Sequence, residues 1–268
     1  MEFYTFLGYF FALFVGITLG VFGSGGSILA VPILVYVFGI ASDLATGYSL
    51  FIVGITSLVG GIHKINEKLV DFKKVFLFGI PTVITVFLTR KFGVPAIPFE
   101  IHFYDFAIKK TLLIMIVFGV FMIFSAIKML KPTKEVSSFK DHQINYLLII
   151  ILGIFVGIVA GFVGAGGGFL IVPILIYYLN TPLKIAIGTS LVIVSIQSSI
   201  GFLGDFFVNR AAYNWHLLII FSICSLLGIW IGNFIIKKIK AEKLKYVFAV
   251  FILTMGLFIL VKELLLSK

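Results

Sequence analysis

Long apolar runs without a charged residue constrain this chain more than any other feature. Segments 146–163, 217–236 and 246–261 each continue for most of the width of a bilayer without an acidic or basic side chain. A helix needs about 20 apolar residues to cross the hydrocarbon. Hydrophobic residues make up 61% of the 268 positions and charged residues 12%, whereas soluble domains have roughly half and one quarter. The pattern therefore predicts an all-α polytopic membrane protein that folds in the lipid bilayer.

The chain also contains an internal repeat. Residues 16–36, GITLGVFGSGGSILAVPILVY, match residues 157–177, GIVAGFVGAGGGFLIVPILIY, at a constant offset of 141 positions. Continued to residue 60 without a gap, the alignment contains 21 identities over 45 positions, which shared hydrophobicity alone does not produce. A long-range repeat of this kind indicates duplication of one structural unit.

Ten apolar segments predict five helical segments in each half. The polar stretch 131–143 is the expected cytoplasmic linker between a first repeat at 1–130 and a second at 144–268. Because five is odd, we expect the halves to face opposite ways across the membrane, as the inverted-topology repeats of many transporters do. The segments are 4–22, 28–40, 44–62, 75–90, 111–129, 145–163, 168–180, 185–204, 215–236 and 246–264.

Two of these segments, 28–40 and 168–180, contain only about 13 residues, fewer than the ~20 that span a bilayer upright. Each is therefore expected either to cross at a tilt or to return as half of a re-entrant hairpin. The opposite orientation of the two halves holds in both cases, because a hairpin removes two crossings from each half.

The net charge of +10 comes from lysines clustered between apolar segments, not from a basic stripe with exposed aromatics, so nucleic-acid binding is not expected. Cytoplasmic loops accumulate basic residues, and we assign all three clusters to that side. With Lys184 on the same side, this places 14 of the 21 basic residues inside and both termini outside. Glu2 and the lack of a basic stretch before the first apolar run argue against a cleaved signal peptide. The clusters are Lys64, Lys68, Lys73 and Lys74; Lys128, Lys131, Lys134 and Lys140; and Lys237, Lys238, Lys240, Lys243 and Lys245.

Each repeat has a glycine-rich break between two apolar segments, followed by a proline, Pro32 or Pro173, as a hinge. Each glycine costs a helix about 1 kcal/mol relative to alanine, and the freed backbone groups need other partners in a bilayer. The breaks are therefore the predicted substrate-binding sites. They comprise Gly23, Ser24, Gly25, Gly26 and Ser27 in the first half and Gly164, Ala165, Gly166, Gly167 and Gly168 in the second.

A new helix is expected after each break, near Ile28 and Phe169. Its unpaired N–H groups and the positive end of its dipole would point into the protein, an arrangement that favours an anion. The alternative is that glycines let helices pack closely. We expect that packing role at Gly16, Gly20, Gly157 and Gly161.

A second set of polar residues lies on the segment after each break. Spaced seven or eight residues apart, these side chains share one helix face and could present hydroxyls and an amide to the same cavity. Hydrogen bonds between helices are the alternative role for each of them. The predicted binding residues in this set are Ser49, Ser190, Gln197 and Ser198, with Thr56, Ser57, Thr189 and Ser199 nearby.

Other reactive groups are sparse. Charged residues near segment ends, including Asp43, Lys184, Asp205 and Arg210, are interpreted as interface anchors. With no acid at mid-membrane, coupling through a central carboxylate is not predicted. The four histidines lie near loops without ligand spacing, so neither a metal nor a cofactor is expected. The single Cys224 excludes a disulfide or redox pair within the chain.

The motifs GSGGSILAVPILV and GAGGGFLIVPILI, each followed by a G-x-S-L segment, resemble the TauE/SafE sulfite exporter family, also called TSUP. The likeness extends over essentially the whole chain. It implies a permease of the cytoplasmic (inner) membrane for sulfite, organosulfonates or related small anions, usually exporting them. Substrates in the family diverge, so the family name does not fix the cargo. Where the first break has Ser24 and Ser27, the second has Ala165 and Gly168, so the site should be only pseudo-symmetric.

These features predict a secondary transporter of a small anion that works by alternating access around the paired breaks. An anion channel is the nearest alternative. An intramembrane enzyme, a different class, would need paired acids, a serine with a nearby histidine or a cysteine pair within the helices, and none is evident. The sequence leaves open the substrate, the direction of transport, the coupling ion and the oligomeric state. A homodimer is one alternative for the oligomeric state.

Overall fold

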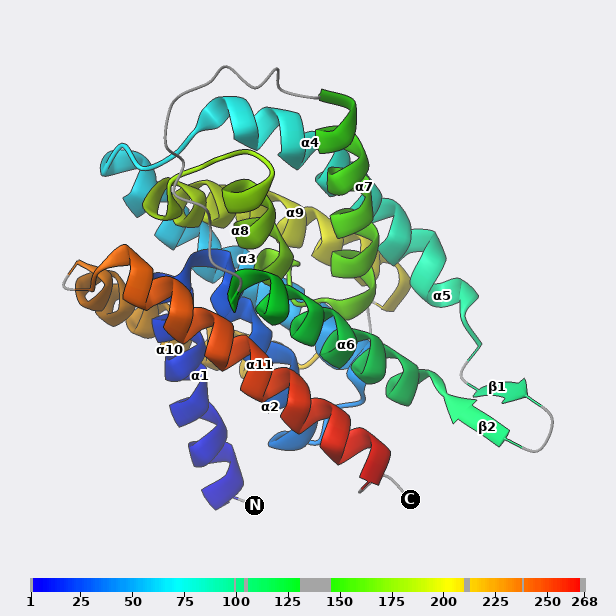
Figure 1. Ribbon diagram of the computed structural model, residues 1–268. Coiled ribbons are helices and arrows are strands. Elements are labelled where there is room, and N and C mark those ends of the chain that lie inside the picture. Colours follow the sequence, from blue (N-terminus) through cyan, green and yellow to red (C-terminus); the bar gives the residue numbers. More distant parts are fainter. Residues whose placement is uncertain are drawn as a thin grey trace.

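A computed structural model of the chain describes residues 2–98, 100–103, 106–130, 146–209, 213–237 and 239–265. The described part is a bundle of helices with one short β-hairpin at its edge (Figure 1). Eight helical stretches in it are long and apolar enough to cross a membrane. The predicted all-α polytopic class is confirmed.

The helices follow the predicted segments, because each apolar run must satisfy its own backbone groups in lipid. Each repeat supplies a first helix, a break, a short second helix and three further helices. In chain order the elements are α1 (Glu2–Phe22), the 3-10 helix η1 (Gly23–Leu29), α2 (Ala30–Tyr36), α3 (Ser42–Asn66), α4 (Phe72–Leu88), the π-helix η2 (Thr89–Gly93), α5 (Val94–Ala96), β1 (Glu100–Phe103), β2 (Phe106–Lys109), α6 (Lys110–Leu130), α7 (Tyr146–Val163), α8 (Gly168–Tyr177), α9 (Leu183–Asn209), α10 (Trp215–Ile236) and α11 (Ala241–Leu265).

The segment between α4 and α6 differs from the sequence prediction, which contained no strands. The helix of α4 continues through a π-helical turn into α5, and β1 then pairs antiparallel with β2, Glu100 opposite Lys109. Four residues a strand are too few for a periodicity to be recognised against the apolar background. The hairpin projects from the bundle at the right of Figure 1.

Matching helices of the two repeats make matching contacts. α1 packs on α10 as α7 packs on α4, while α3 packs on α9 and α6 on α11. Gly54 faces Ser199 and Gly61 faces Val192, so α3 and α9 run antiparallel. The pairs α1–α10 and α4–α7 contain the close approaches expected at small residues. A Cβ on Gly16 would lie 1.9 Å from the carbonyl oxygen of Ser225, and one on Gly157 would lie 2.7 Å from that of Thr82.

Basic residues from separate loops gather at one end of the bundle, which we call the lysine-rich end. Lys237 lies 3.0 Å from the Glu67 carboxylate, and the Lys74 amino group donates to Thr181 at 2.9 Å. Burial alone would raise the pKa of Glu67, but hydrogen bonds from Lys64 and Lys237 lower it to about 2. This end lies at the left of Figure 1, opposite the β-hairpin.

The chain reverses direction at each break. α2 returns to the start of α1, where a Cβ on Gly8 would strike the ring of Phe38. α8 returns along α7 to the lysine-rich end, where the Tyr177 hydroxyl donates to the Met129 carbonyl at 3.2 Å. Both short segments are therefore the returning arms of helical hairpins. The α1–α2 hairpin starts at the end opposite the lysines, and the α7–α8 hairpin starts at the lysine-rich end.

Candidate functional site

The tips of the two hairpins meet inside the bundle. The Ser27 hydroxyl donates a hydrogen bond to the carbonyl of Ala165. A Cβ on Gly168 would lie 2.0 Å from the carbonyl oxygen of Ser24, so the two backbones touch there. Residues 23–27 and 164–168 are all buried. The predicted breaks, which lie 141 positions apart, thus form one structure, which we call the tip contact.

The first break is a 3-10 helix, not an open break. Its backbone N–H groups bond to carbonyls three residues earlier, and the chain enters α2 at Ala30, where the N–H bonds to Ser27. The expectation that an α-helix begins near Ile28 with a set of unpaired N–H groups is therefore wrong for this half. The backbone already satisfies itself, so the first break contributes the hydroxyls of Ser24 and Ser27 instead.

The second break is a turn that only glycine adopts without strain. Gly164, Gly166 and Gly167 have φ angles of +69°, +66° and +60°, a region that disfavours side chains. α8 begins at Gly168, and the N–H of Leu170 bonds to the Gly167 carbonyl at 2.9 Å. The Gln197 side-chain amide on α9 donates to the Gly166 carbonyl. Gln197 therefore fixes the turn to the helix that lies beneath it.

Several buried polar atoms of the first break, α3 and α9 have no hydrogen-bond partner within the described residues. A Cβ on Gly166 would lie 2.8 Å from the Ser198 hydroxyl, which places that hydroxyl against the turn. Leaving a buried polar group unsatisfied costs about 1–3 kcal/mol, so a cluster of them is typical of a polar ligand site. The unpartnered atoms are the hydroxyls of Ser24, Ser49, Ser57 and Ser198 and the side-chain carbonyl oxygen of Gln197.

Other predicted site residues have packing contacts. The Ser190 hydroxyl donates to the Ile187 carbonyl of its own helix at 2.8 Å. A Cβ on Gly23 would strike Ile187, one on Gly25 would strike the Phe248 ring, and one on Gly26 would strike the α1 backbone. Pro32 and Pro173 are buried in α2 and α8. These residues set how closely the hairpins approach their neighbours.

A buried charged cluster adjoins the second break, and sequence reasoning missed it. Arg90 is 0% exposed, and its Nη1 lies 3.3 Å from Asp205, which is 3% exposed. The Tyr213 hydroxyl donates to the other oxygen of Asp205. The interpretation of Asp205 as an interface anchor is therefore wrong. Lys184 is exposed and Asp43 half-buried, as anchors are, and Arg210 lies outside the described residues.

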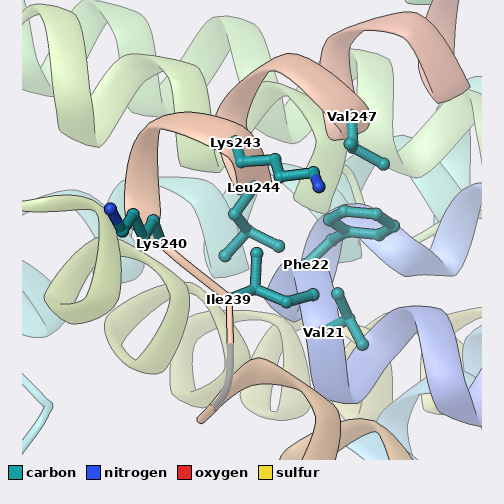
Figure 2. A pocket seen from close by; sticks show the side chains of 7 residues that line it. All are labelled: Val21, Phe22, Ile239, Lys240, Lys243, Leu244 and Val247. Atoms are coloured by element: carbon teal, nitrogen blue, oxygen red, sulfur yellow. The ribbon is translucent and has the colours of Figure 1, made fainter.

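A cavity of about 290 Å³ lies at the lysine-rich end, directly before the first break. The Lys243 side chain extends toward the ring of Phe22 in Figure 2, whereas that of Lys240 points away. Phe22 stacks on Phe248 with ring centroids 4.9 Å apart, and Phe248 covers Gly25. This aromatic pair therefore separates the cavity from the tip contact. The lining residues are Val21, Phe22, Ile239, Lys240, Lys243, Leu244 and Val247.

Comparison with known proteins identifies the family of the chain. The family model described as sulfite exporter TauE/SafE matches residues 9–259. The chain belongs to the TauE/SafE family. Family membership and the eight apolar helical stretches support a multi-pass membrane transporter. The resemblance predicted from the two glycine motifs is therefore confirmed.

Relatives of this TauE/SafE protein match it over most of its length. A "probable membrane transporter protein" of Methanocaldococcus jannaschii is 29% identical over 92% of the chain and 91% of its own length. One of Xylella fastidiosa is 27% identical over the same shares. One of Bacillus subtilis is 25% identical over 79% of each chain. No solved structure matches the chain.

Proposed function

We propose that this protein is a secondary transporter of a small anion, sulfite or an organosulfonate, in the cytoplasmic membrane, and not an enzyme. The tip contact carries the proposal. It brings unpartnered hydroxyls from Ser24 and Ser198 to a buried position between two hairpins that start at opposite ends of the bundle. Hydroxyl and amide donors in a water-poor site suit an anion, and central sites between paired broken helices are typical of secondary transporters.

Alternating access follows from an inverted relation between the repeats, which is part of the proposal. Its support is the set of matched helix pairs and the antiparallel packing of α3 on α9. If the halves are related by a two-fold axis in the membrane plane, rocking one against the other opens the tip contact first to one end and then to the other. Because the tips touch, a continuous open pore has less support than a transporter.

The decisive experiment measures flux in proteoliposomes. We expect saturable efflux of labelled sulfite, inhibited by an organosulfonate and weakly by acetate, with and without an imposed pH gradient. Empty liposomes are the control. Flux of none of the tested anions above that control would contradict the substrate assignment. Linear flux that does not saturate would favour a channel.

Phe248→Leu is expected to weaken closure at the lysine-rich end. The Phe248 ring covers Gly25 and stacks on Phe22, so its loss connects the cavity to the first break. Gradient-driven accumulation of the anion should fall several-fold while exchange of the anion continues. Phe251→Leu is the matched control, because Phe251 also stacks on Phe22, at 5.8 Å, but is not among the atoms nearest Gly25. Equal accumulation in both variants would show that Phe248 has no special role in closure.

A further inference from the structure

Arg90 is an unusual group to bury in a membrane helix. It lies on the π-helix η2, the kind of distortion that is common at functional sites. Its guanidinium packs against the second break, since a Cβ on Gly164 would lie 2.3 Å from Nη2. Ala165, the next residue, accepts the Ser27 hydrogen bond. The charge therefore lies directly against the tip contact.

The pairing of Arg90 uses only part of its donor set. Nη1 faces Asp205 at 3.3 Å, a single long contact, and Tyr213 bonds the other carboxylate oxygen. Nε and Nη2 have no hydrogen-bond partner within the described residues. These two nitrogens form the side edge of the guanidinium, whose parallel N–H groups match two oxygens of one oxyanion. An arginine buried only for stability would be expected to present this edge to its carboxylate.

We propose that Nε and Nη2 of Arg90 bind the transported anion, which is an oxyanion with two or more oxygens on one central atom. The inference rests on the proposed function and deepens it by assigning a charged group to the site. Asp205 holds the guanidinium in place when no anion is bound and competes with the anion for its charge. Asp43 and Lys110 complete the charged surroundings, so two acids and two bases balance before an anion arrives.

The contact between α1 and α10 matches the contact between α7 and α4, but the two differ in charge. Gly20 of α1 is approached by Ile229, Gly232 and Asn233 of α10. At the matching contact, Gly161 of α7 is approached by Val86 and Thr89, and Arg90 follows Thr89 in the chain. Among these residues only Arg90 is a cation. At this pair of matching helix contacts, a charged residue therefore lies beside the second break, and none of the compared residues beside the first break is charged.

The test compares Arg90→Lys with the unaltered protein, purified in detergent. Binding of sulfite, methanesulfonate and chloride is measured by calorimetry, and folding by thermal unfolding and size exclusion. Lysine keeps the positive charge but lacks the two parallel N–H groups of the guanidinium. We expect sulfite and methanesulfonate to bind at least about tenfold more weakly, the scale of a lost hydrogen bond to a charged group, while chloride changes less. Lys91→Gln, which removes an exposed charge next door, should bind as the unaltered protein does.

Asp205→Asn is expected to change oxyanion binding in the opposite direction. Removing the competing carboxylate should strengthen oxyanion binding, whereas a purely structural ion pair predicts no strengthening. If Arg90→Lys does not fold, Asp205→Asn decides the question. Unchanged or weaker oxyanion binding by Asp205→Asn then overturns the inference. Equal binding by Arg90→Lys and the unaltered protein also overturns it, and leaves the proposed function standing. If the unaltered protein binds none of these anions, the proposed function fails, and this inference fails with it.

Discussion

Replacing Gly168 by alanine should reduce anion flux about a hundredfold, the scale on which a displacement of about 1 Å disturbs a positioned site. The added Cβ would lie 2.0 Å from the Ser24 carbonyl oxygen and 2.2 Å from the Ser24 carbonyl carbon. These atoms belong to a buried backbone, so they cannot move aside as a flexible side chain does. The hairpin tips must separate, and the hydroxyls around them lose their arrangement. The measurement is the initial rate of sulfite efflux from proteoliposomes.

Gly79→Ala is the control for this change. Gly79 lies inside α4, and its Cβ would meet Ile193 at 3.6 Å, an ordinary contact. Alanine also favours a helix over glycine by about 1 kcal/mol, so folding and flux should match the unaltered protein. Size exclusion establishes whether Gly168→Ala folds. Undiminished efflux by a folded Gly168→Ala protein would show that the tips need not touch for transport.

The sequence predicts the location of the tips better than their conformation. Hydrophobic runs and the repeat place both breaks, because several glycines in succession between apolar segments disfavour a continuous helix. The aligned glycines nevertheless differ in conformation. Gly166 and Gly167 have positive φ, whereas their counterparts Gly25 and Gly26 lie in a 3-10 helix. Tertiary contacts, such as the hydrogen bond from the Gln197 amide to the Gly166 carbonyl, decide between these conformations. The local sequence around each break does not indicate these contacts.

The Arg90–Asp205 pair could not be predicted from the local pattern. Each residue lies near the end of an apolar segment, where charges usually contact the interface, and 115 positions separate them. One signal was present, because Arg90 falls within the predicted segment 75–90. An ionisable residue inside a membrane segment is a functional hypothesis by default. Its partner became evident only when the packing of α4 on α9 was known.

Gln197→Leu should lower flux at least tenfold and destabilise the protein by about 1–3 kcal/mol, the cost of an unsatisfied buried polar group. The Gln197 amide is the donor to the Gly166 carbonyl, and its carbonyl oxygen is unpartnered beside Ser198. Leucine has similar size but removes both groups. Ser195→Ala is the control, because the Ser195 hydroxyl donates to the Val192 carbonyl of its own helix at 2.8 Å. This variant should keep full flux.

Gln197→Glu separates support of the turn from contact with the anion. A carboxylate next to a bound anion repels it, and a proton on the carboxylate removes that repulsion. Flux of an organosulfonate, whose own charge does not change with pH, should therefore be low at neutral pH and rise as the pH falls and the introduced carboxylate gains a proton. Gln197→Leu should show no such rise. Equal pH profiles for the two variants would place the anion away from Gln197 and leave this residue only its bond to Gly166.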